Sequence, residues 1–487
     1  MFIDESRIET RAFINGSYIM SKSGKKLEKI SSLTGKRIVD ITDCDELDVD
    51  MAVSCALKAY ESGVWSEKSP EERKNVILKF ADLMQENIDE LARLDTYETS
   101  RAYKNYLYDS LPKAIEAVRY FAEAVDKVYD AAIPPKKDSF GIIYRKPLGV
   151  VAVITPWNDP MVVTSWKSIP ALLMGNSVII KPAEQSSLSA IRVAALAKEA
   201  GIPDGVYNVI PGRGEIVGKA LAEHKDVRGV FFTGSSEVGK KIIDYSSSNM
   251  KKVGLECGGK SPYIVTKNCG DLKKAAETLA ANVFYNQGQI CSAPSRLIVD
   301  NEVKDKFLNY LFAAADNYMP GDSFNIDNNV GCVVSPEQYE RVMKYIEIGK
   351  KESGGYYEAK GETDIPEDAK AVKPTIFYDV NEDAVIATEE IFGPVITVLG
   401  YDTIEDAIRI ANCSNYGLAG AVWTDDLKEA YYVAKAIESG LVHINSYGED
   451  DNMSPFGGFK ESGIGKDKSV YAFDEYSELK SVWVKTI

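Results

Sequence analysis

The chain has 487 residues, 45% of them hydrophobic, which is enough for a large core and for two or three domains. Its net charge of −16 and its pI near 4.9 leave no basic surface for nucleic acid or for an anionic membrane. Its seven cysteines show neither CxxC nor zinc-type spacing. We therefore expect reduced thiols, no metal site and no nucleic-acid partner.

The N-terminus, MFIDESRIETR, begins with acidic residues, and no apolar run reaches the length of a signal peptide core or a membrane span. The sequence therefore predicts a cytoplasmic location. Only two histidines occur, His224 and His443, and neither lies in a motif. A general base, if there is one, is expected to be a carboxylate.

In chain order, residues 45–125 have a helical pattern, with Ser69 as an N-cap before Pro70. From 141 to 260, five strand-like runs alternate with four helix-like segments and short Gly/Pro turns. The strand-like runs are 149–155, 177–182, 206–211, 228–234 and 252–259. This alternation predicts an α/β fold with a doubly wound parallel sheet, which binds ligands at the carboxyl ends of its strands.

The glycines of this region do not match the GxGxxG dinucleotide motif. Residues 212–218 hold one residue too many, and 234–239 lack the second glycine. A tight strand-to-helix turn explains each segment at least as well as phosphate binding does. Residues 271–450 then begin a second alternation, which indicates a second α/β domain.

Cys291 lies among small and amide-bearing residues in NQGQICSAPSR, residues 286–296. Most intracellular cysteines only pack as small hydrophobes, and that alternative stays open for this residue alone. The setting nevertheless indicates a nucleophile.

Together, seven segments resemble the NAD(P)-dependent aldehyde dehydrogenase family, in family order and over nearly the whole chain. They are ITPWND (154–159), KPAEQS (181–186), FTGSSEVG (232–239), LECGGKSP (255–262), GQICSAPSR (288–296), EEIFGPV (389–395) and SPFGGFKESGIGKD (454–467). The resemblance implies a Rossmann-type NAD-binding domain (1–125 and 148–258), an α/β catalytic domain (259–461) and a β oligomerisation arm (126–147 and 462–487). It also implies a homo-oligomer, either a dimer or a tetramer.

By the same resemblance, Cys291 attacks the aldehyde, Asn158 holds the oxyanion with the Cys291 amide, and Glu256 activates the water that opens a thioester. Lys167 is assigned to the catalytic group with them. Without the family pattern, Asn158 reads equally well as a turn residue and Glu256 as a solvated strand end. A fold that has kept these residues but lost activity is the less favoured alternative.

The resemblance also assigns the cofactor site. Lys181 and Glu184 hold the adenosine ribose, so NAD is preferred over NADP, although some relatives with this glutamate use both. The remaining assigned residues are Ile154, Thr155, Pro156, Trp157, Gly214, Phe232, Gly234, Ser235, Val238, Gly258, Gln338, Glu390 and Phe392.

The expected substrate tunnel is lined by Asp159, Val163, Trp166, Ile290, Ser292, Glu449, Asp450 and Phe456. Asp159 stands where an aromatic residue is common in the family. Residues 449–451 are three consecutive acids at the expected tunnel mouth, which suits a cationic aldehyde, with Trp166 as a cation–π face. An ordinary solvated loop explains these acids equally well. The C-terminal run resembles enzymes of polyamine breakdown, whereas a broad-specificity or semialdehyde dehydrogenase is the alternative.

Overall fold

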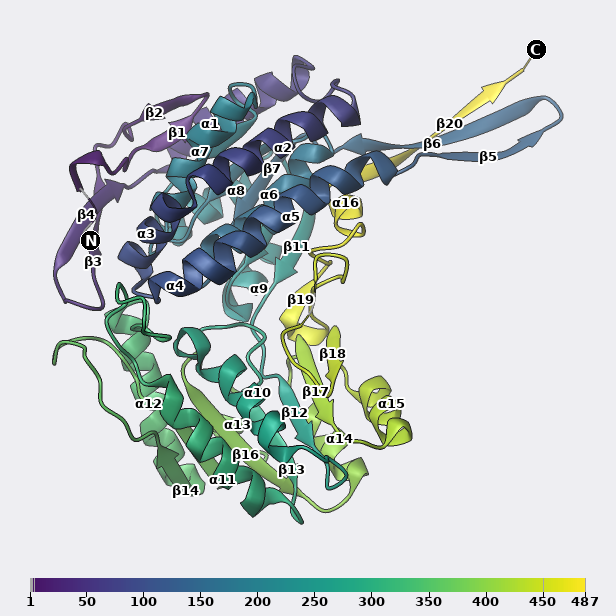
Figure 1. The fold of residues 1–487 in the computed structure, drawn as a ribbon. Coiled ribbons are helices and arrows are strands. Elements are labelled where there is room, and N and C mark those ends of the chain that lie inside the picture. The colour runs from purple at the N-terminus through teal and green to yellow at the C-terminus, as the bar shows by residue number, and fades with distance from the viewer. Residues whose placement is uncertain (1–2, 4, 450, 487) are drawn as a thin grey trace.

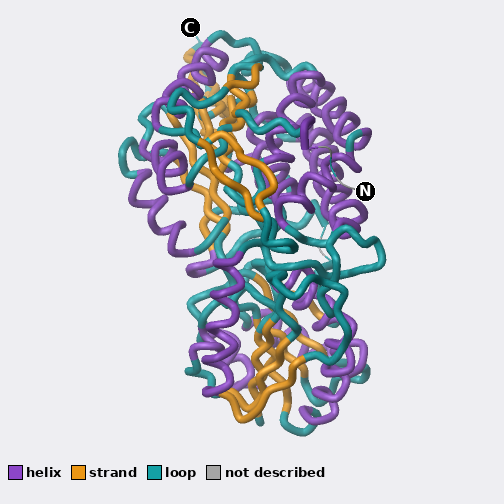
Figure 2. Tube along the Cα trace, turned by 90° about the vertical axis from the view of Figure 1, so that its left-hand side faces the viewer, coloured by secondary structure: helices purple, strands orange, loops and turns teal. Residues whose placement is uncertain are grey.

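In the computed structural model, residues 3, 5–449 and 451–486 are described. They form two lobes (Figures 1 and 2), and an arm projects from one of them in Figure 1. The first lobe contains an eight-stranded sheet in the order β19-β11-β10-β7-β8-β9-β1-β2. Its five central strands are parallel and fall on the five predicted runs. They are β7 (Val150–Ile154), β8 (Ser177–Lys181), β9 (Tyr207–Val209), β10 (Val227–Thr233) and β11 (Lys252–Glu256).

The predicted doubly wound sheet is therefore confirmed. Its crossover helices are α6 (Pro160–Leu173), α7 (Leu188–Ala200), η4 with α8 (Gly214–Gly218 and Lys219–Glu223) and α9 (Ser236–Ser246). The edge strands are β1 (Ala12–Ile14), β2 (Ser17–Ile19) and β19 (Gly463–Ile464), all antiparallel to their neighbours. β7 and β8 are buried at every position, as strands covered by helices on both faces must be.

The N-terminal region supplies helices and a separate hairpin to this lobe. The helices are α1 (Glu46–Glu61), α2 (Pro70–Glu86), α3 (Ile88–Thr99), α4 (Tyr103–Asn105), η2 (Tyr106–Ser110) and α5 (Leu111–Ala124). Ser69 caps α2 as predicted, in a capping box with Glu72. The hairpin of β3 (Lys26–Ile30) and β4 (Arg37–Thr42) forms a two-stranded sheet of its own.

The second lobe is the second predicted α/β unit, a seven-stranded sheet in the order β14-β15-β16-β13-β12-β17-β18. Only β14 is antiparallel to its neighbour. The strands are β12 (Pro262–Val265), β13 (Arg296–Asp300), β14 (Ser353–Glu358), β15 (Thr375–Val380), β16 (Val395–Tyr401), β17 (Ala419–Trp423) and β18 (Leu441–Ile444). The helices are α10 (Leu272–Phe284), η5 (Tyr285–Gly288), α11 (Lys304–Ala315), α12 (Pro336–Glu352), α13 (Val385–Thr388), α14 (Ile404–Asn412) and α15 (Leu427–Ala436).

The arm is a three-stranded antiparallel sheet of β5 (Ala131–Lys136), β6 (Ser139–Pro147) and β20 (Ser477–Lys485), which extends away from both lobes in Figure 1. Residues 462–476, which the sequence assigned to this arm, lie instead against the first lobe. There β19 pairs with β11, and α16 (Ala472–Glu475) packs near α6. None of the helices in the described part of the chain is long and apolar enough to cross a membrane.

Candidate active site

A hollow of about 680 Å³ opens at the carboxyl ends of β7, β8 and β10, the edge at which parallel sheets bind ligands. Eleven residues assigned to the cofactor line it: Ile154, Thr155, Pro156, Trp157, Lys181, Glu184, Gly214, Phe232, Gly234, Ser235 and Val238. Ser235 caps α9 by accepting the amide of Val238, so the predicted strand-to-helix turn is present at the edge of this hollow.

Lys181 and Glu184 form an ion pair of 3.3 Å inside the hollow, and Lys181 is buried. Burial alone would raise the pKa of the Glu184 carboxyl. The Lys181 charge and the Gly214 amide together lower this pKa by a larger amount, so it lies below its usual value. Burial also lowers the pKa of Lys181, and Glu184 opposes this shift. The pair therefore presents an ionised carboxylate at the hollow.

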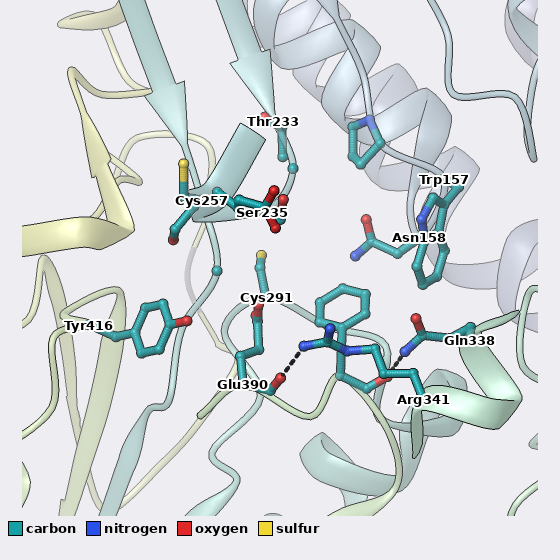
Figure 3. A pocket seen from close by; sticks show the side chains of 16 residues that line it. Trp157, Asn158, Thr233, Ser235, Cys257, Cys291, Gln338, Arg341, Glu390 and Tyr416 are labelled. Carbon is teal, nitrogen blue, oxygen red and sulfur yellow. Dashed lines mark hydrogen bonds between the residues drawn. The ribbon is translucent and has the colours of Figure 1, made fainter. Parts of the chain in front are cut away.

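A second hollow of about 340 Å³ continues from the first, since both are lined by Pro156, Trp157, Thr233, Gly234 and Ser235. Cys291 lies in this second hollow together with Gly258, Gln338, Glu390 and Phe392, the remaining four residues assigned to the cofactor (Figure 3). The rings of Trp157 and Phe392 meet edge to face at 5.3 Å. Sequence reasoning missed six lining residues, namely Thr233, Ser236, Glu237, Cys257, Arg341 and Tyr416.

The second hollow is held together by backbone contacts. Gln338 donates to the carbonyl of Phe392 at 2.8 Å, and Arg341 donates to the carbonyl of Glu390 at 2.8 Å. The Gly259 amide donates to the Glu390 carboxylate at 3.1 Å. Burial raises the pKa of Glu390 to about 7.

The loop before Cys291 has an uncommon backbone. Asn286 and Gln287 have φ values of 51° and 55°, and an added Cβ at Gly288 would lie 2.0 Å from the Gly393 carbonyl oxygen. Asparagine and glycine tolerate these conformations best, which explains the small and amide-bearing residues of this stretch. Burial, followed by the charges of Glu390 and Glu256, raises the pKa of the Cys291 thiol to about 12.

Asn158 faces the same cavity as Cys291 (Figure 3). Its side-chain nitrogen donates to the carbonyl of Gln289 at 3.0 Å, which joins it to the nucleophile loop. Its own backbone carbonyl accepts from Arg101 and from Asn286, each at 3.2 Å. Its backbone is thus held from two directions.

Arg101, which the sequence analysis did not select, is the centre of a charged cluster beside Asn158. The Arg101 guanidinium is buried and lies 3.4 Å from the Asp159 carboxylate. It donates to the Tyr285 hydroxyl at 2.7 Å, and that hydroxyl donates to Asp109 at 2.8 Å. Burial raises the pKa of Asp159, and the Arg101 charge opposes the shift. Asp159 therefore has a positive partner within the chain.

Glu256 ends β11 and is buried, and one of its carboxylate oxygens has no hydrogen-bond partner among the described residues. Burial, and then Asp467, raises the pKa of Glu256 well above its usual value, while Lys167 and Lys466 oppose the shift. Lys167 is buried and bonded to Asp467 at 2.8 Å. The structure thus gathers two assigned catalytic residues, Glu256 and Lys167, around Asp467, which was missed.

Among the assigned tunnel residues, Trp166 and Phe456 pack with ring centres 5.4 Å apart. The Lys468 ammonium lies 5.3 Å from the Trp166 ring centre and 6.0 Å from that of Phe456, so this cation–π face already holds a cation of the chain. The remaining tunnel assignments are dispersed: Val163 is buried in α6, Ile290 and Ser292 flank Cys291, and Glu449 is exposed. Asp450 lies outside the described residues.

Two buried threonine hydroxyls in the cleft, of Thr155 and Thr233, have no hydrogen-bond partner among the described residues. Buried hydroxyls are normally bonded, so the hydrogen-bonding capacity of these two is not used by the described residues. Together with the ionised Glu184 and the helix N-terminus at Ser235, they fit a dinucleotide along the two hollows. The described residues hold no cluster of His, Cys, Asp and Glu arranged for a metal ion.

A sequence model described as the aldehyde dehydrogenase family matches residues 18–482. The chain belongs to this family. NADP/NAD-dependent aldehyde dehydrogenase PuuC of Escherichia coli (strain K12) is 43% identical to it over 98% of this chain and 96% of that protein. Aminoacetaldehyde dehydrogenase of Pseudomonas aeruginosa is 39% identical over 97% and 95%, respectively.

Solved structures match nearly the whole chain. The aldehyde dehydrogenase KauB from Pseudomonas aeruginosa superposes with a TM-score of 0.96 at 45% identity, covering 98% of this chain and 97% of that one. Gamma-glutamyl-gamma-aminobutyraldehyde dehydrogenase from Burkholderia cenocepacia J2315 gives 0.94 at 44% identity, covering 99% and 97%. The chain is thus an NAD(P)-dependent oxidoreductase that acts on aldehydes, and the fold implied by the sequence resemblance is confirmed.

Proposed function

We propose that this aldehyde dehydrogenase oxidises a small amino-aldehyde, with water, to the carboxylate, and that Cys291 is its nucleophile. The observation that carries the proposal is the shared cavity, where Cys291 and Asn158 lie at the inner end of the cofactor cleft. NAD, held by the residues that line the two hollows, would supply the acceptor for the hydride that leaves the substrate carbon. The other steps fall to residues of the chain.

The first of these steps is addition of the Cys291 sulfur to the aldehyde carbon, with the carbonyl electron pair moving to oxygen. A thiol whose pKa is raised to about 12 is mostly protonated at neutral pH, so a base must accept its proton. Solvent water is the proposed acceptor of that proton, and Glu256, whose pKa burial raises well above its usual value, is assigned to the later hydrolysis. The Asn158 amide and the Cys291 backbone amide are the proposed donors to the oxyanion.

Loss of hydride leaves a thioester on Cys291, which water must open. Glu256 is the proposed base for this water, and the C–S bond then breaks to release the carboxylic acid and the thiol. The Lys167–Asp467 pair lies beside Glu256, where its ammonium stabilises the ionised form. We assign Lys167 to this electrostatic role.

For the cofactor, we propose NAD in preference to NADP. The ionised Glu184 carboxylate can accept hydrogen bonds from the ribose hydroxyls, and it repels a 2′-phosphate. The relative PuuC is named as using both cofactors, and Arg213, Lys219 and Lys241 also line this hollow. These cations reduce the repulsion, so a preference is expected in place of strict exclusion of NADP.

The amino-aldehyde assignment is supported by the names of relatives such as aminoacetaldehyde dehydrogenase and gamma-glutamyl-gamma-aminobutyraldehyde dehydrogenase. Within the chain it is supported by Glu449 and Asp451, both exposed on the loop before Phe456. Asp159 and Trp166 support the assignment less, because each already contacts a cation of the chain. Asp159 pairs with Arg101, and the Trp166 ring contacts the Lys468 ammonium. A broad-specificity or semialdehyde dehydrogenase is the alternative that these two contacts favour.

A substrate panel tests the proposal. We expect kcat/KM to be higher for 4-aminobutyraldehyde and betaine aldehyde than for hexanal and succinic semialdehyde, and a preference for the semialdehyde would overturn the charge argument. The Cys291→Ser variant should fold but produce no NADH from any of the four. Cys413→Ser, which alters an exposed cysteine, is the matched control and should keep full activity.

We also propose that the protein is a homo-oligomer joined through the arm and is located in the cytoplasm. The arm exposes large apolar side chains on β6 and β20, namely Phe140, Ile142, Leu479, Trp483 and Val484. Exposed apolar side chains gathered on one sheet are typical of subunit contacts. Light scattering distinguishes a dimer from a tetramer, and a monomeric mass would refute this assignment.

A further inference from the structure

A buried ion pair connects the N-terminal hairpin to the cofactor cleft. Lys29, in β3, and Glu98, at the end of α3, lie 2.7 Å apart, and their side chains are 7% and 0% exposed. The Lys29 ammonium also donates to the backbone carbonyl of Glu184. The β3–β4 hairpin shares no strand pairing with the main sheets, so this lysine reaches the cleft from a separate unit.

The Glu98 carboxylate holds the other end of the same segment. It accepts the backbone amides of Ser187 at 3.0 Å and of Leu188 at 2.6 Å, where α7 begins. A carboxylate at a helix N-terminus satisfies amides that have no partner within the helix. Residues 184–188 are therefore fixed at the carbonyl of Glu184 and at the amides of 187 and 188.

We propose that Lys29 is a positioning residue for the cofactor. Its ammonium sets the backbone of Glu184, and through it the carboxylate that faces the adenosine ribose. The inference rests on the proposed role of Glu184 in binding the ribose. It adds that Lys29 holds the Glu184 backbone in place. The charge matters as well as the hydrogen bond, because without the ammonium the buried Glu98 carboxylate has no cationic partner among these contacts.

Removing the ammonium should weaken NAD binding while leaving the chemical step intact. For Lys29→Ala we expect the Kd of NAD, measured by calorimetry, and the KM for NAD each to rise about tenfold. The value of kcat at saturating NAD should stay within about twofold, because Lys29 touches none of the reacting residues. Lys29→Arg keeps the charge and should bind NAD more tightly than Lys29→Ala.

Chemical rescue separates positioning from general stability. Ammonium or methylammonium chloride should restore most of the NAD affinity of Lys29→Ala, whereas choline chloride at equal ionic strength should not. Lys198→Ala is the matched control. Like Lys29, Lys198 donates to a backbone carbonyl, that of Gly16, and pairs with a carboxylate, that of Asp204 at 3.0 Å. Unlike Lys29, it is exposed and lies near the other end of α7. That variant should keep its NAD affinity and should not respond to ammonium.

Two results with Lys29→Ala would overturn the inference. One is an unchanged NAD affinity in Lys29→Ala, and the other is equal rescue by choline. If Lys29→Ala does not fold, Lys29→Arg decides the question. Wild-type NAD affinity in Lys29→Arg would support the role of the charge, whereas NAD binding as weak as that of Glu184→Gln would refute it. Glu184→Gln is measured in parallel, because unchanged NAD affinity in that variant would refute the proposed role of Glu184 itself.

Discussion

Replacing Arg101 with methionine removes the positive centre of the cluster beside the active site while keeping an apolar side chain of similar length. Three polar contacts are lost: to the Asn158 carbonyl at 3.2 Å, to the Tyr285 hydroxyl at 2.7 Å and to the Asp159 carboxylate at 3.4 Å. The first bears on catalysis, because Asn158 is the proposed oxyanion donor. The third bears on stability, because Asp159 then has no guanidinium beside it.

The size of each effect follows from burial and from the contacts that remain. Breaking a fully buried ion pair costs about 3–5 kcal/mol of unfolding free energy. Because the Asp159 side chain is 30% exposed, solvent screens part of the charge and we expect about 2–3 kcal/mol. Removing an oxyanion donor lowers the rate by about 10²–10³. Asn286 still donates to the Asn158 carbonyl, so a smaller loss of about 10–100-fold in the NADH burst rate is expected.

The pH dependence has a definite sign. Burial already raises the pKa of Asp159 above its usual value, and loss of Arg101 raises it further. The penalty is therefore full at pH values above the raised pKa, and it shrinks as the pH falls towards that pKa and Asp159 becomes protonated. The stability deficit of Arg101→Met should therefore shrink as the pH is lowered from neutrality.

Denaturant unfolding and stopped-flow NADH measurements check these values. Adding Asp159→Asn to Arg101→Met should recover most of the stability, because the unpaired carboxylate is gone, but not the burst rate, because the Asn158 carbonyl still lacks its donor. Equal recovery of both quantities would show that Arg101 acts only through Asp159. A wild-type burst rate and stability in Arg101→Met alone would refute the reasoning altogether.

Two further predictions concern the reacting groups. Because burial raises the pKa of Cys291 to about 12, its alkylation by iodoacetamide should accelerate about tenfold per pH unit between pH 7 and 9. Mass spectrometry follows the alkylation, with Cys413 as the internal reference. A rate independent of pH would contradict a protonated resting thiol. Glu256→Gln should keep the NADH burst while steady-state turnover falls by about 10²–10⁴, and a variant without the burst would move Glu256 to thiol deprotonation.

Much of the fold is predictable from the sequence, because strands buried on both faces must be continuous apolar runs. β7 and β8 are buried at all positions and coincide with the predicted runs to within a residue at each end. The bounds of the arm were harder to predict from the sequence, because they included β19, which belongs to the first lobe. β19 is two residues long and pairs with β11 across more than 200 residues of sequence. A strand that short has no periodicity to detect.

The candidate site was predictable where residues act through their own chemistry. All fifteen residues assigned to the cofactor line the two connected hollows. The residues that were missed act through contacts that only the fold creates, as when Asp467 meets Lys167 across 300 positions. Arg101 likewise meets Asn158 across 57 positions, and nothing in its own sequence segment marks it.

The acidic residues assigned to the tunnel differ in whether a cation of the chain lies beside them. Asp159 borders the expected tunnel as a carboxylate, but the buried guanidinium of Arg101 lies 3.4 Å away. A neutralised pair attracts a distant cation only weakly, because its two opposite fields largely cancel. Any preference for a cationic aldehyde must therefore arise mainly at Glu449 and Asp451, which are exposed on the loop that begins at Tyr447. Since exposed charges are screened within about 10 Å at 0.1 M salt, that preference should weaken as salt is added.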